Sequence, residues 1–340
     1  MHKVVTFGEL MARLAPRGYL KLYQADSFDV NYTGAEANIC VSLSMFGMDN
    51  EFVTKLPDNE ITKVAKSMLR KYGVGMHHIT LGGDRMGVYY LERGASQRAS
   101  KVIYDRKYSS LSMADRSDFD WDAIFEGADW FHFTGITAAL SDNMPAICED
   151  ACKAAKRHGV TISCDLNYRK TLWSKEKAQK IMGNLMQYID VVVGNEEDAS
   201  TTLGISPDKT DVYAGKLNYE SYVQVAEKIC QRYGQKTVAF TLRTSKSASD
   251  NTWAGMLYTD GKAYFSKSYE IHMVDRVGGG DSFSAGLIYA LESGYEPQKT
   301  IEFAVAASCL KQTMEYDFNL ATVQEVTALM EGDGSGRVQR

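Results

Sequence analysis

The sequence predicts an α/β fold in which a central, mostly parallel sheet is flanked by helices and accompanied by a small β lid. Two observations predict the main part: short apolar segments alternate with longer helix-like segments, and several helix-like segments end at a glycine. A third observation predicts the lid, because residues 12–33 and 83–108 interrupt this alternation with aromatic, strand-like pieces.

The alternation can be followed from the N-terminus. We expect strands where short runs are apolar and rich in β-branched or aromatic residues, and helices where apolar residues recur every three to four positions. The expected strands are residues 4–7, 51–55, 130–134, 160–164, 190–193 and 237–241, and the expected helices are residues 35–46, 61–72, 144–157, 175–188 and 222–233. Strands and helices that alternate in this way form parallel sheets with helices on both faces.

The two exceptional regions are expected to form strands outside the main sheet. A lid made by them would keep water from competing as the acceptor of a transferred group. The alternative is a surface hairpin without a catalytic role. We expect one domain over residues 1–331 and a disordered tail over residues 332–340, which are small and polar.

Composition and charge exclude several classes of protein. The net charge of −5 gives no support for nucleic-acid binding, and no apolar run reaches the length of a membrane span. The chain begins with a strand-like segment and lacks the apolar region of a signal peptide, so we expect a cytoplasmic protein. The six cysteines lie scattered in apolar patterns and are expected to be buried free thiols.

The segment with the clearest chemistry is the glycine run Gly278-Gly279-Gly280, which Asp281 follows. Another molecule can approach a backbone without side chains closely, and the helix that starts here offers free N–H groups, so the turn predicts an anion site. A carboxylate beside an anion site suits phosphoryl transfer to a hydroxyl, whose proton Asp281 would orient and accept. We expect the helix N-terminus to lower the pKa of Asp281. The alternative is an ordinary glycine turn with an aspartate at a helix start.

This segment resembles the C-terminal signature of the ribokinase-like (PfkB) family of sugar kinases, Asp-Thr-x-Gly-Ala-Gly-Asp. The matching residues are Asp275, Gly278, Gly280 and Asp281, whereas Arg276 and Gly279 differ. Further family elements follow in the right order over most of the chain: Gly8-Glu9, Thr33-Gly34-Ala35-Glu36-Ala37-Asn38 and Asn195-Glu196-Glu197-Asp198. Within the family the chain most resembles the 2-keto-3-deoxygluconate kinases, on the basis of Arg276, Tyr104-Asp105-Arg106 and Asp165-Leu166-Asn167-Tyr168-Arg169.

The resemblance implies a ribokinase-like kinase that uses ATP and Mg²⁺. Asp281 with Gly278, Gly279 and Gly280 would be catalytic. The implied cofactor contacts are Asn195, Arg243, Ser245, Gly278 and Gly280, and Asp198 with Glu197 would serve Mg²⁺ indirectly. The Gly-x-x-Gly that many members carry after residues 237–241 is absent, which leaves adenine selectivity open.

The expected substrate class depends on two arginines, Arg106 and Arg169. A sugar acid needs a cation for its carboxylate, and a guanidinium binds a carboxylate with two hydrogen bonds. Arg169 is also a candidate contact of the ATP phosphates. Further substrate contacts implied by the resemblance are Gly34, Asn38, Tyr89, Tyr104 and Asp317. Tyrosines in strands are more often packing residues, so the two tyrosines have an ordinary alternative.

The leading hypothesis is therefore a kinase that phosphorylates the terminal hydroxyl of 2-keto-3-deoxygluconate. One alternative is a kinase for a neutral sugar such as fructose or ribose, and a second is a non-catalytic sugar sensor with a kinase fold. The resemblance also implies a homo-oligomer, since the lid makes a dimer contact in many members. A monovalent cation is common in the wider family, but the residues decide neither its presence nor the gluconate or galactonate stereochemistry of the substrate.

Overall fold

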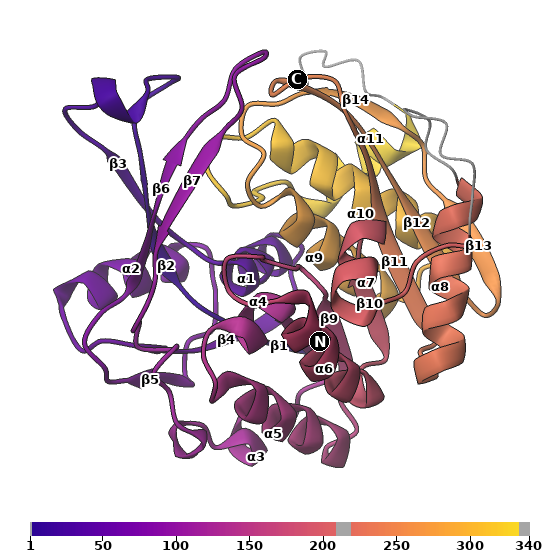
Figure 1. Ribbon diagram of the computed structural model, residues 1–340, viewed down its shortest axis with the longest axis horizontal. Coiled ribbons are helices and arrows are strands. Elements are labelled where there is room, and N and C mark those ends of the chain that lie inside the picture. Colours follow the sequence, from indigo (N-terminus) through magenta and orange to yellow (C-terminus); the bar gives the residue numbers. More distant parts are fainter. Residues whose placement is uncertain (1, 209–218, 333–340) are drawn as a thin grey trace.

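The structure is a computed structural model that describes residues 2–208 and 219–332, and it confirms the predicted α/β fold (Figure 1). A ten-stranded sheet has the order β13-β12-β11-β10-β9-β8-β1-β4-β5, and β14 pairs with β12. Neighbours from β11 to β5 pair in parallel, whereas β12 pairs antiparallel with β11, β13 and β14. The strands are β1 (Lys3–Phe7), β4 (Asp49–Leu56), β5 (Ile79–Leu81), β8 (Trp130–Thr134), β9 (Thr161–Asp165), β10 (Val191–Gly194), β11 (Thr237–Ser245), β12 (Asp250–Thr259), β13 (Lys262–Phe265) and β14 (Tyr269–His272).

Helices cover both faces of this sheet because its buried strands are apolar on both sides. Side chains alternate along a strand, so Val191 and Val193 of β10 pack in one apolar core and Val192 packs in the other. The helices on the Val191 side are α1 (Ala35–Met45), α9 (Gly279–Glu292), α10 (Pro297–Gln312) and α11 (Val323–Glu331). The helices on the Val192 side are α3 (Trp121–Ile124), α4 (Gly135–Ala139), α5 (Met144–Arg157), α6 (Lys175–Leu185), α7 (Glu196–Leu203) and α8 (Tyr219–Tyr233). Helix α2 (Glu60–Lys71) packs with α1 and β4 in a third apolar cluster.

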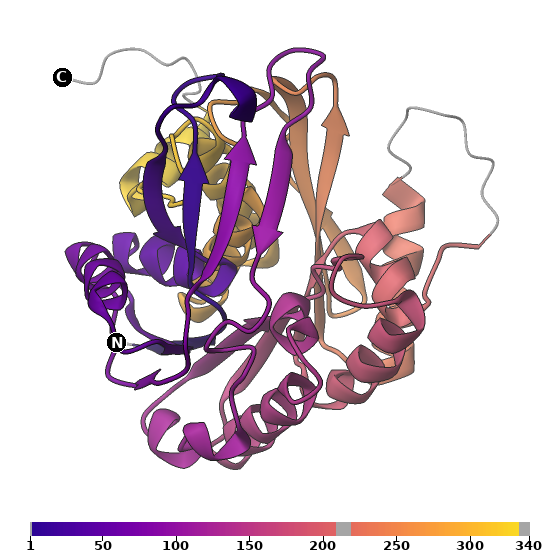
Figure 2. The same ribbon diagram turned by 60° about the vertical axis from the view of Figure 1, so that its left-hand side comes forward.

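The predicted strands outside the main sheet form a separate sheet, which we call the lid sheet. Its order is β3-β2-β6-β7, with bounds β2 (Met11–Ala15), β3 (Asp29–Thr33), β6 (Gly87–Glu92) and β7 (Lys101–Asp105). One face packs Met11, Tyr89 and Leu91 near Val277, immediately before the glycine run. The β6–β7 turn reaches the β11–β12 turn (Figure 2), where the Ala248 N–H donates to the Ser96 carbonyl at 2.7 Å. The lid sheet therefore contacts the main body near the glycine run and at the β11–β12 turn, among other places.

The structure also differs from the predicted elements. Strand β11 continues to Ser245, four residues beyond the predicted end, because it pairs with β12 along its whole length. The antiparallel strands β12, β13 and β14 are not predicted by the alternation of strands and helices. The predicted tail lies, apart from Gly332, outside the described residues.

Two smaller expectations can be compared with the structure. All six cysteines are free thiols, and five of them are buried while Cys230 is half-buried. Among the described residues, none of the helices has the length and apolar character that a membrane crossing requires.

Candidate active site

A cleft of about 960 Å³ lies where the lid sheet faces the carboxyl ends of the main-sheet strands. Strands β9 and β10 end at Asp165 and Gly194, which both line the cleft, and the lid contributes residues such as Tyr89 and Tyr104. The carboxyl edge of a parallel sheet is the usual ligand site of open α/β folds. The fold therefore gathers polar side chains from distant parts of the chain in one place.

The glycine run begins helix α9 at one wall of this cleft. Gly278 is the N-cap with φ of 85°, and a Cβ there would lie 2.0 Å from the Asp317 carbonyl oxygen, so only glycine fits. A Cβ on Gly280 would meet no protein atom within 4 Å, so this residue faces open space in the cleft. The N–H groups of a first helical turn have no partner inside the helix. The turn therefore has the geometry that the predicted backbone anion site requires.

Asp281 lies in the first turn of α9, but the predicted direction of its pKa shift is wrong. Burial raises the pKa of Asp281 to about 7, against the effect of a hydrogen bond from Asn38 and with the support of the carboxylates of Glu36 and Asp317. The helix start is visible in the sequence, whereas the surrounding carboxylates and the loss of water are not. A carboxylate with a pKa close to neutral is a competent general base at physiological pH.

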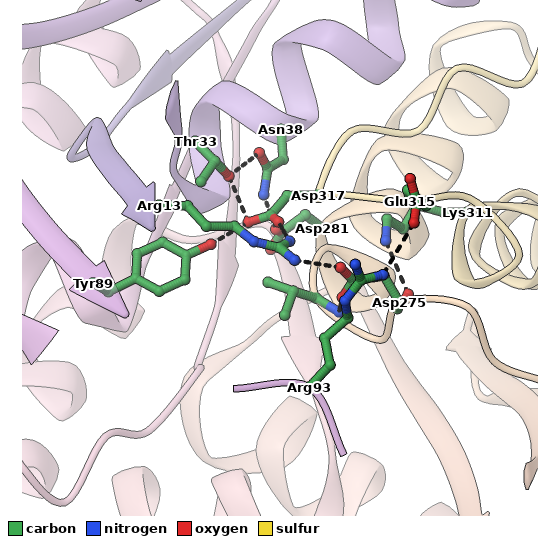
Figure 3. A network of polar contacts seen from close by, with 11 residues as sticks. Arg13, Thr33, Asn38, Tyr89, Arg93, Asp275, Asp281, Lys311, Glu315 and Asp317 are labelled. Atoms are coloured by element: carbon green, nitrogen blue, oxygen red, sulfur yellow. Dashed lines mark hydrogen bonds and ion pairs between the residues drawn. The ribbon is translucent and has the colours of Figure 1, made fainter. Parts of the chain in front are cut away.

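A network of polar side chains holds Asp281 (Figure 3). The Asn38 amide donates to Oδ2 of Asp281 at 2.7 Å. The Thr33 hydroxyl lies 2.7 Å from Oδ1 of Asn38 and 2.8 Å from Oδ2 of Asp317. Asp317 also accepts hydrogen bonds from Tyr89 and from the buried Arg13. Asn38 therefore contacts the Asp281 carboxylate, while Asp317 is 3% exposed and holds the groups around it.

Acidic residues face the cleft from the ends of β9 and β10. Asn195 caps helix α7 by accepting from the Asp198 N–H at 2.8 Å, and its amide donates to the Asp198 carboxylate at 2.7 Å. Burial raises the pKa of Asp198 to about 6. Burial, Asp198 and Asp281 together hold the pKa of Asp165 well above its usual range. Glu197 is exposed at the rim.

Three arginines line the cleft without an ion-pair partner among the described residues: Arg169, Arg243 and Arg276. Burial and the neighbouring Arg243 lower the pKa of Arg276, which shows that the two guanidinium groups repel each other. Arg106 differs, because its Nε donates to Glu9 at 2.8 Å and its charge is balanced there. The unpaired positive charge of the cleft therefore lies with the other three arginines and with the exposed Lys175.

All of the predicted site residues except Ser245 line this one cleft. Ser245 lies at the exposed end of β11, outside the lining residues. The residues brought together are Gly34, Asn38, Tyr89, Tyr104, Arg106, Arg169, Asn195, Glu197, Asp198, Arg243, Gly278, Gly279, Gly280, Asp281 and Asp317. Gly34 is explained by packing, since a Cβ there would lie 1.9 Å from the Glu9 carbonyl oxygen.

Sequence reasoning missed several residues of this site. Arg13 gives no local signal, because it is a single charge in an otherwise apolar strand. Glu36 is buried against the Thr134 N–H and the Thr137 hydroxyl, although its place in a helix start suggests an exposed residue. Arg276 could have been found, since it lies two positions before the glycine run.

Comparison with known proteins agrees with this geometry. Residues 1–316 match the family model described as pfkB family carbohydrate kinase. A 2-dehydro-3-deoxygalactonokinase of Haloferax volcanii is 29% identical over 98% of this chain and 98% of that protein. A 2-dehydro-3-deoxygluconokinase of Thermoproteus tenax is 27% identical over 91% of this chain and 88% of that protein.

A solved structure is more similar still. The crystal structure of 2-dehydro-3-deoxygluconokinase from Thermotoga maritima is 51% identical, covers 97% of this chain and 98% of its own, and superposes with a TM-score of 0.93. The chain therefore belongs to the pfkB family of carbohydrate kinases.

Proposed function

We propose that this kinase transfers the γ-phosphoryl group of ATP to the terminal hydroxyl of 2-keto-3-deoxygluconate or its galactonate epimer. The observation that carries the proposal is the composition of one cleft. Asp281, a carboxylate with a pKa of about 7, lies there beside the glycine turn and among arginines without an ion-pair partner. The relatives named for both sugar acids support the substrate class.

The chemistry assigned to the chain follows from the positions of its groups. Asp281 takes the proton of the acceptor hydroxyl, and its raised pKa matches that task near pH 7. The N–H group of Gly280 stabilises the charge on the oxygens of the phosphoryl group in transit, together with that of Gly279, whose bond to the Arg276 carbonyl is long at 3.4 Å. Arg243 and Arg276, which repel each other in the absence of an anion, gain most from a polyphosphate between them.

Mg²⁺ fits the residues present. Asp165 and Asp198 line the cleft without an ion pair, and a divalent cation would offset the burial that raises both pKa values. The part of the chain that the structure describes contains no ready cluster of three or more carboxylate, histidine or cysteine ligands. This pattern agrees with Mg²⁺ held by one or two carboxylates, by water and by phosphates. When bound, Mg²⁺ would neutralise charge on the phosphate oxygens.

The substrate carboxylate is assigned to Arg169, with Arg106 beside it. Arg169 is half-buried and makes no direct ion pair, so its guanidinium can still bind a sugar acid. Its charge also acts on three nearby carboxylates and lowers the pKa values of Asp165, Asp198 and Asp281. Glu9 balances most of the Arg106 charge, so Arg106 should bind the substrate carboxylate more weakly than Arg169 does. The Arg106 guanidinium lies over the Tyr104 ring, with 5.4 Å between the guanidinium and the ring centre.

The test is ADP release with ATP and Mg²⁺ over a panel of 2-keto-3-deoxygluconate, its galactonate epimer, fructose and ribose. We expect turnover of a keto-deoxy acid at least about 100-fold more efficient than that of either neutral sugar, since the buried cationic site has no partner in a neutral sugar. Preference for fructose or ribose would refute the sugar-acid assignment. Binding without turnover of any sugar would favour the sensor.

Arg169→Gln provides the matched variant for the carboxylate. Arg169→Gln breaks no direct ion pair, although it removes a charge that lowers the pKa values of Asp165, Asp198 and Asp281. Arg106→Ala, in contrast, would leave the buried Glu9 without its ion-pair partner. We expect the KM for the sugar acid to rise about 10- to 100-fold. An unchanged KM for the sugar acid with a raised KM for ATP would instead assign Arg169 to the phosphates.

We also propose a cytoplasmic homo-oligomer. The six free thiols support a reducing compartment. On the face of the lid sheet that carries Leu14 and Tyr90, opposite the cleft-lining Val102, β7 exposes Ile103 and β3 exposes Val30. Sedimentation of the purified protein would test the oligomer, and a monomer at micromolar concentration would contradict it.

A further inference from the structure

A continuous series of polar contacts joins the lid sheet to the Asp281 carboxylate (Figure 3). The Thr33 hydroxyl lies between two acceptor oxygens and shares its single proton between them. It begins at Arg13 in the middle of strand β2 and passes through Asp317 after helix α10. It continues through Thr33 at the end of β3 and Asn38 in α1, and it ends at Asp281 in α9. We call these five residues the Arg13 chain. Five different segments of the fold each contribute one member.

Arg13 is placed to position other groups and not to bind a ligand. It is 1% exposed, and it is absent from the residues that line the cleft. Its two terminal nitrogens bond to different carboxylates, Asp317 and Asp275. A planar guanidinium can hold two carboxylates in a fixed relation, whereas the ammonium of lysine is a single point of charge.

The second carboxylate links Arg13 to the anion site as well. Oδ1 of Asp275 accepts from the Val277 N–H at 3.2 Å, and the Asp275 carbonyl accepts from Lys311 at 3.0 Å. Val277 directly precedes Gly278, the N-cap of α9. One arginine therefore fixes both the orientation of Asp281, through Asp317, and the start of the glycine turn, through Asp275.

We propose that Arg13 is a positioning residue for phosphoryl transfer, which acts on Asp281 through Asp317, Thr33 and Asn38. The inference rests on the proposed function of Asp281 as the group that accepts the hydroxyl proton. Because Arg13 belongs to the lid sheet, the orientation of Asp281 depends on the place of the lid. A displacement of the reacting groups by about 1 Å costs on the order of 100-fold in rate.

The lid sheet has another ion pair with the same segment, and it provides a control. Arg93, just after β6, pairs with Glu315 at 3.2 Å, two residues before Asp317. This pair also ties the lid to the body but has no bond to the Arg13 chain. If Arg13 acted only as a tether of the lid, loss of the Arg93 pair would have a similar effect.

The experiment compares Arg13→Lys, Thr33→Val, their double variant and the control Arg93→Met. Thr33→Val keeps the shape of the side chain and removes the hydroxyl that joins Asp317 to Asn38, while both ion pairs of Arg13 remain. Each variant is assayed with the acceptor that the wild-type protein phosphorylates fastest. A wrong substrate assignment therefore leaves the test of Arg13 intact.

We expect Arg13→Lys and Thr33→Val each to lower kcat about 10- to 100-fold with KM for ATP within about 3-fold of wild type. Both substitutions interrupt the same series of contacts, so their effects should not multiply. The kcat of the double variant should lie within about 3-fold of the kcat of the slower single variant. Arg93→Met should keep the wild-type kcat. A merely structural role of Arg13 would lower the melting temperature but would not produce this coupling.

Three results would overturn the proposal. These are a wild-type kcat for Arg13→Lys, a double variant whose loss is the product of the two single losses, and a loss in Arg93→Met equal to that in Arg13→Lys. If Arg13→Lys does not fold, the test rests on Thr33→Val alone. An unchanged kcat in that variant refutes the proposed positioning role of Arg13.

Discussion

Replacing Asp281 with asparagine should inactivate the kinase and at the same time stabilise the fold at high pH. Asparagine has the shape of aspartate, and its amide oxygen can still accept the hydrogen bond from Asn38. The substitution removes only the charge and the basic oxygen. The rate of phosphoryl transfer should fall about 100- to 10,000-fold, the usual contribution of a positioned general base.

The gain in stability follows from the shifted pKa. Burial raises the pKa of Asp281 from its ordinary 3.8 to about 7, so the ionised carboxylate is disfavoured in the folded state. Well below pH 3.8 Asp281 is protonated in both the folded and the unfolded state, so its ionisation does not affect the free energy of unfolding. The cost grows between that pH and pH 7 and is constant above it. It amounts to about 2 kcal/mol at pH 5 and about 4 kcal/mol at pH 8, as upper limits because the cleft admits solvent.

The assay is urea unfolding of the wild-type protein and Asp281→Asn at pH 5 and at pH 8, without ligands. We expect the variant to be more stable at both pH values, and the difference to grow by about 2 kcal/mol between them. A difference that does not change with pH, or a variant less stable at pH 8, would refute the raised pKa. In that case the helix N-terminus would dominate the environment of Asp281 after all.

Three further predictions concern the same cleft. Because Asp281 must be ionised to accept a proton, kcat/KM should fall tenfold per pH unit below about pH 7, and a flat profile down to pH 5 would exclude it as the base. Arg276→Gln should raise the KM for ATP about 10-fold without loss of melting temperature, since it relieves the repulsion from Arg243; unchanged steady-state kinetics would remove Arg276 from the phosphate site. Gly280→Ala should keep the wild-type melting temperature but lose about 100-fold in kcat/KM, because its methyl group would enter the cleft. Gly278→Ala should also lower the melting temperature because of the φ of 85° at that position, and a fully active Gly280→Ala would contradict the anion site.

Much of the fold could be predicted because local signals decide it. The strand at residues 130–134 and the helix at residues 144–157 agree with β8 and α5 at both ends. Their apolar periodicity and the glycine at position 159 are local features. The predicted end of β11 was wrong because β11 pairs with β12 in an antiparallel hairpin. The sequence of a strand does not indicate how far its pairing with a partner strand continues.

The candidate site shows the same division. Gly278 and Asp281 were predicted because the chemistry of a backbone anion site requires a glycine run at a helix start. The pKa of Asp281 was predicted in the wrong direction because its burial, and to a smaller extent the carboxylates of Glu36 and Asp317, depend on parts of the chain that are distant in sequence. Arg13 could not be found at all, since nothing in its own strand indicates two carboxylates more than 260 residues away.

The bond between Arg13 and Asp317 also has a consequence for how the protein folds. The two residues are 304 positions apart, so the catalytic cleft closes on one of the longest loops that the chain allows. The entropy of closing such a loop exceeds that of a loop of about 10 residues by about 3 kcal/mol. During synthesis, Arg13 and Thr33 can therefore make their contacts with Asp317 only after the last part of the chain has been made, so the site forms late. Contacts of this high order slow folding, and enzymatic activity should appear as the final event of refolding, after most of the helical signal has returned.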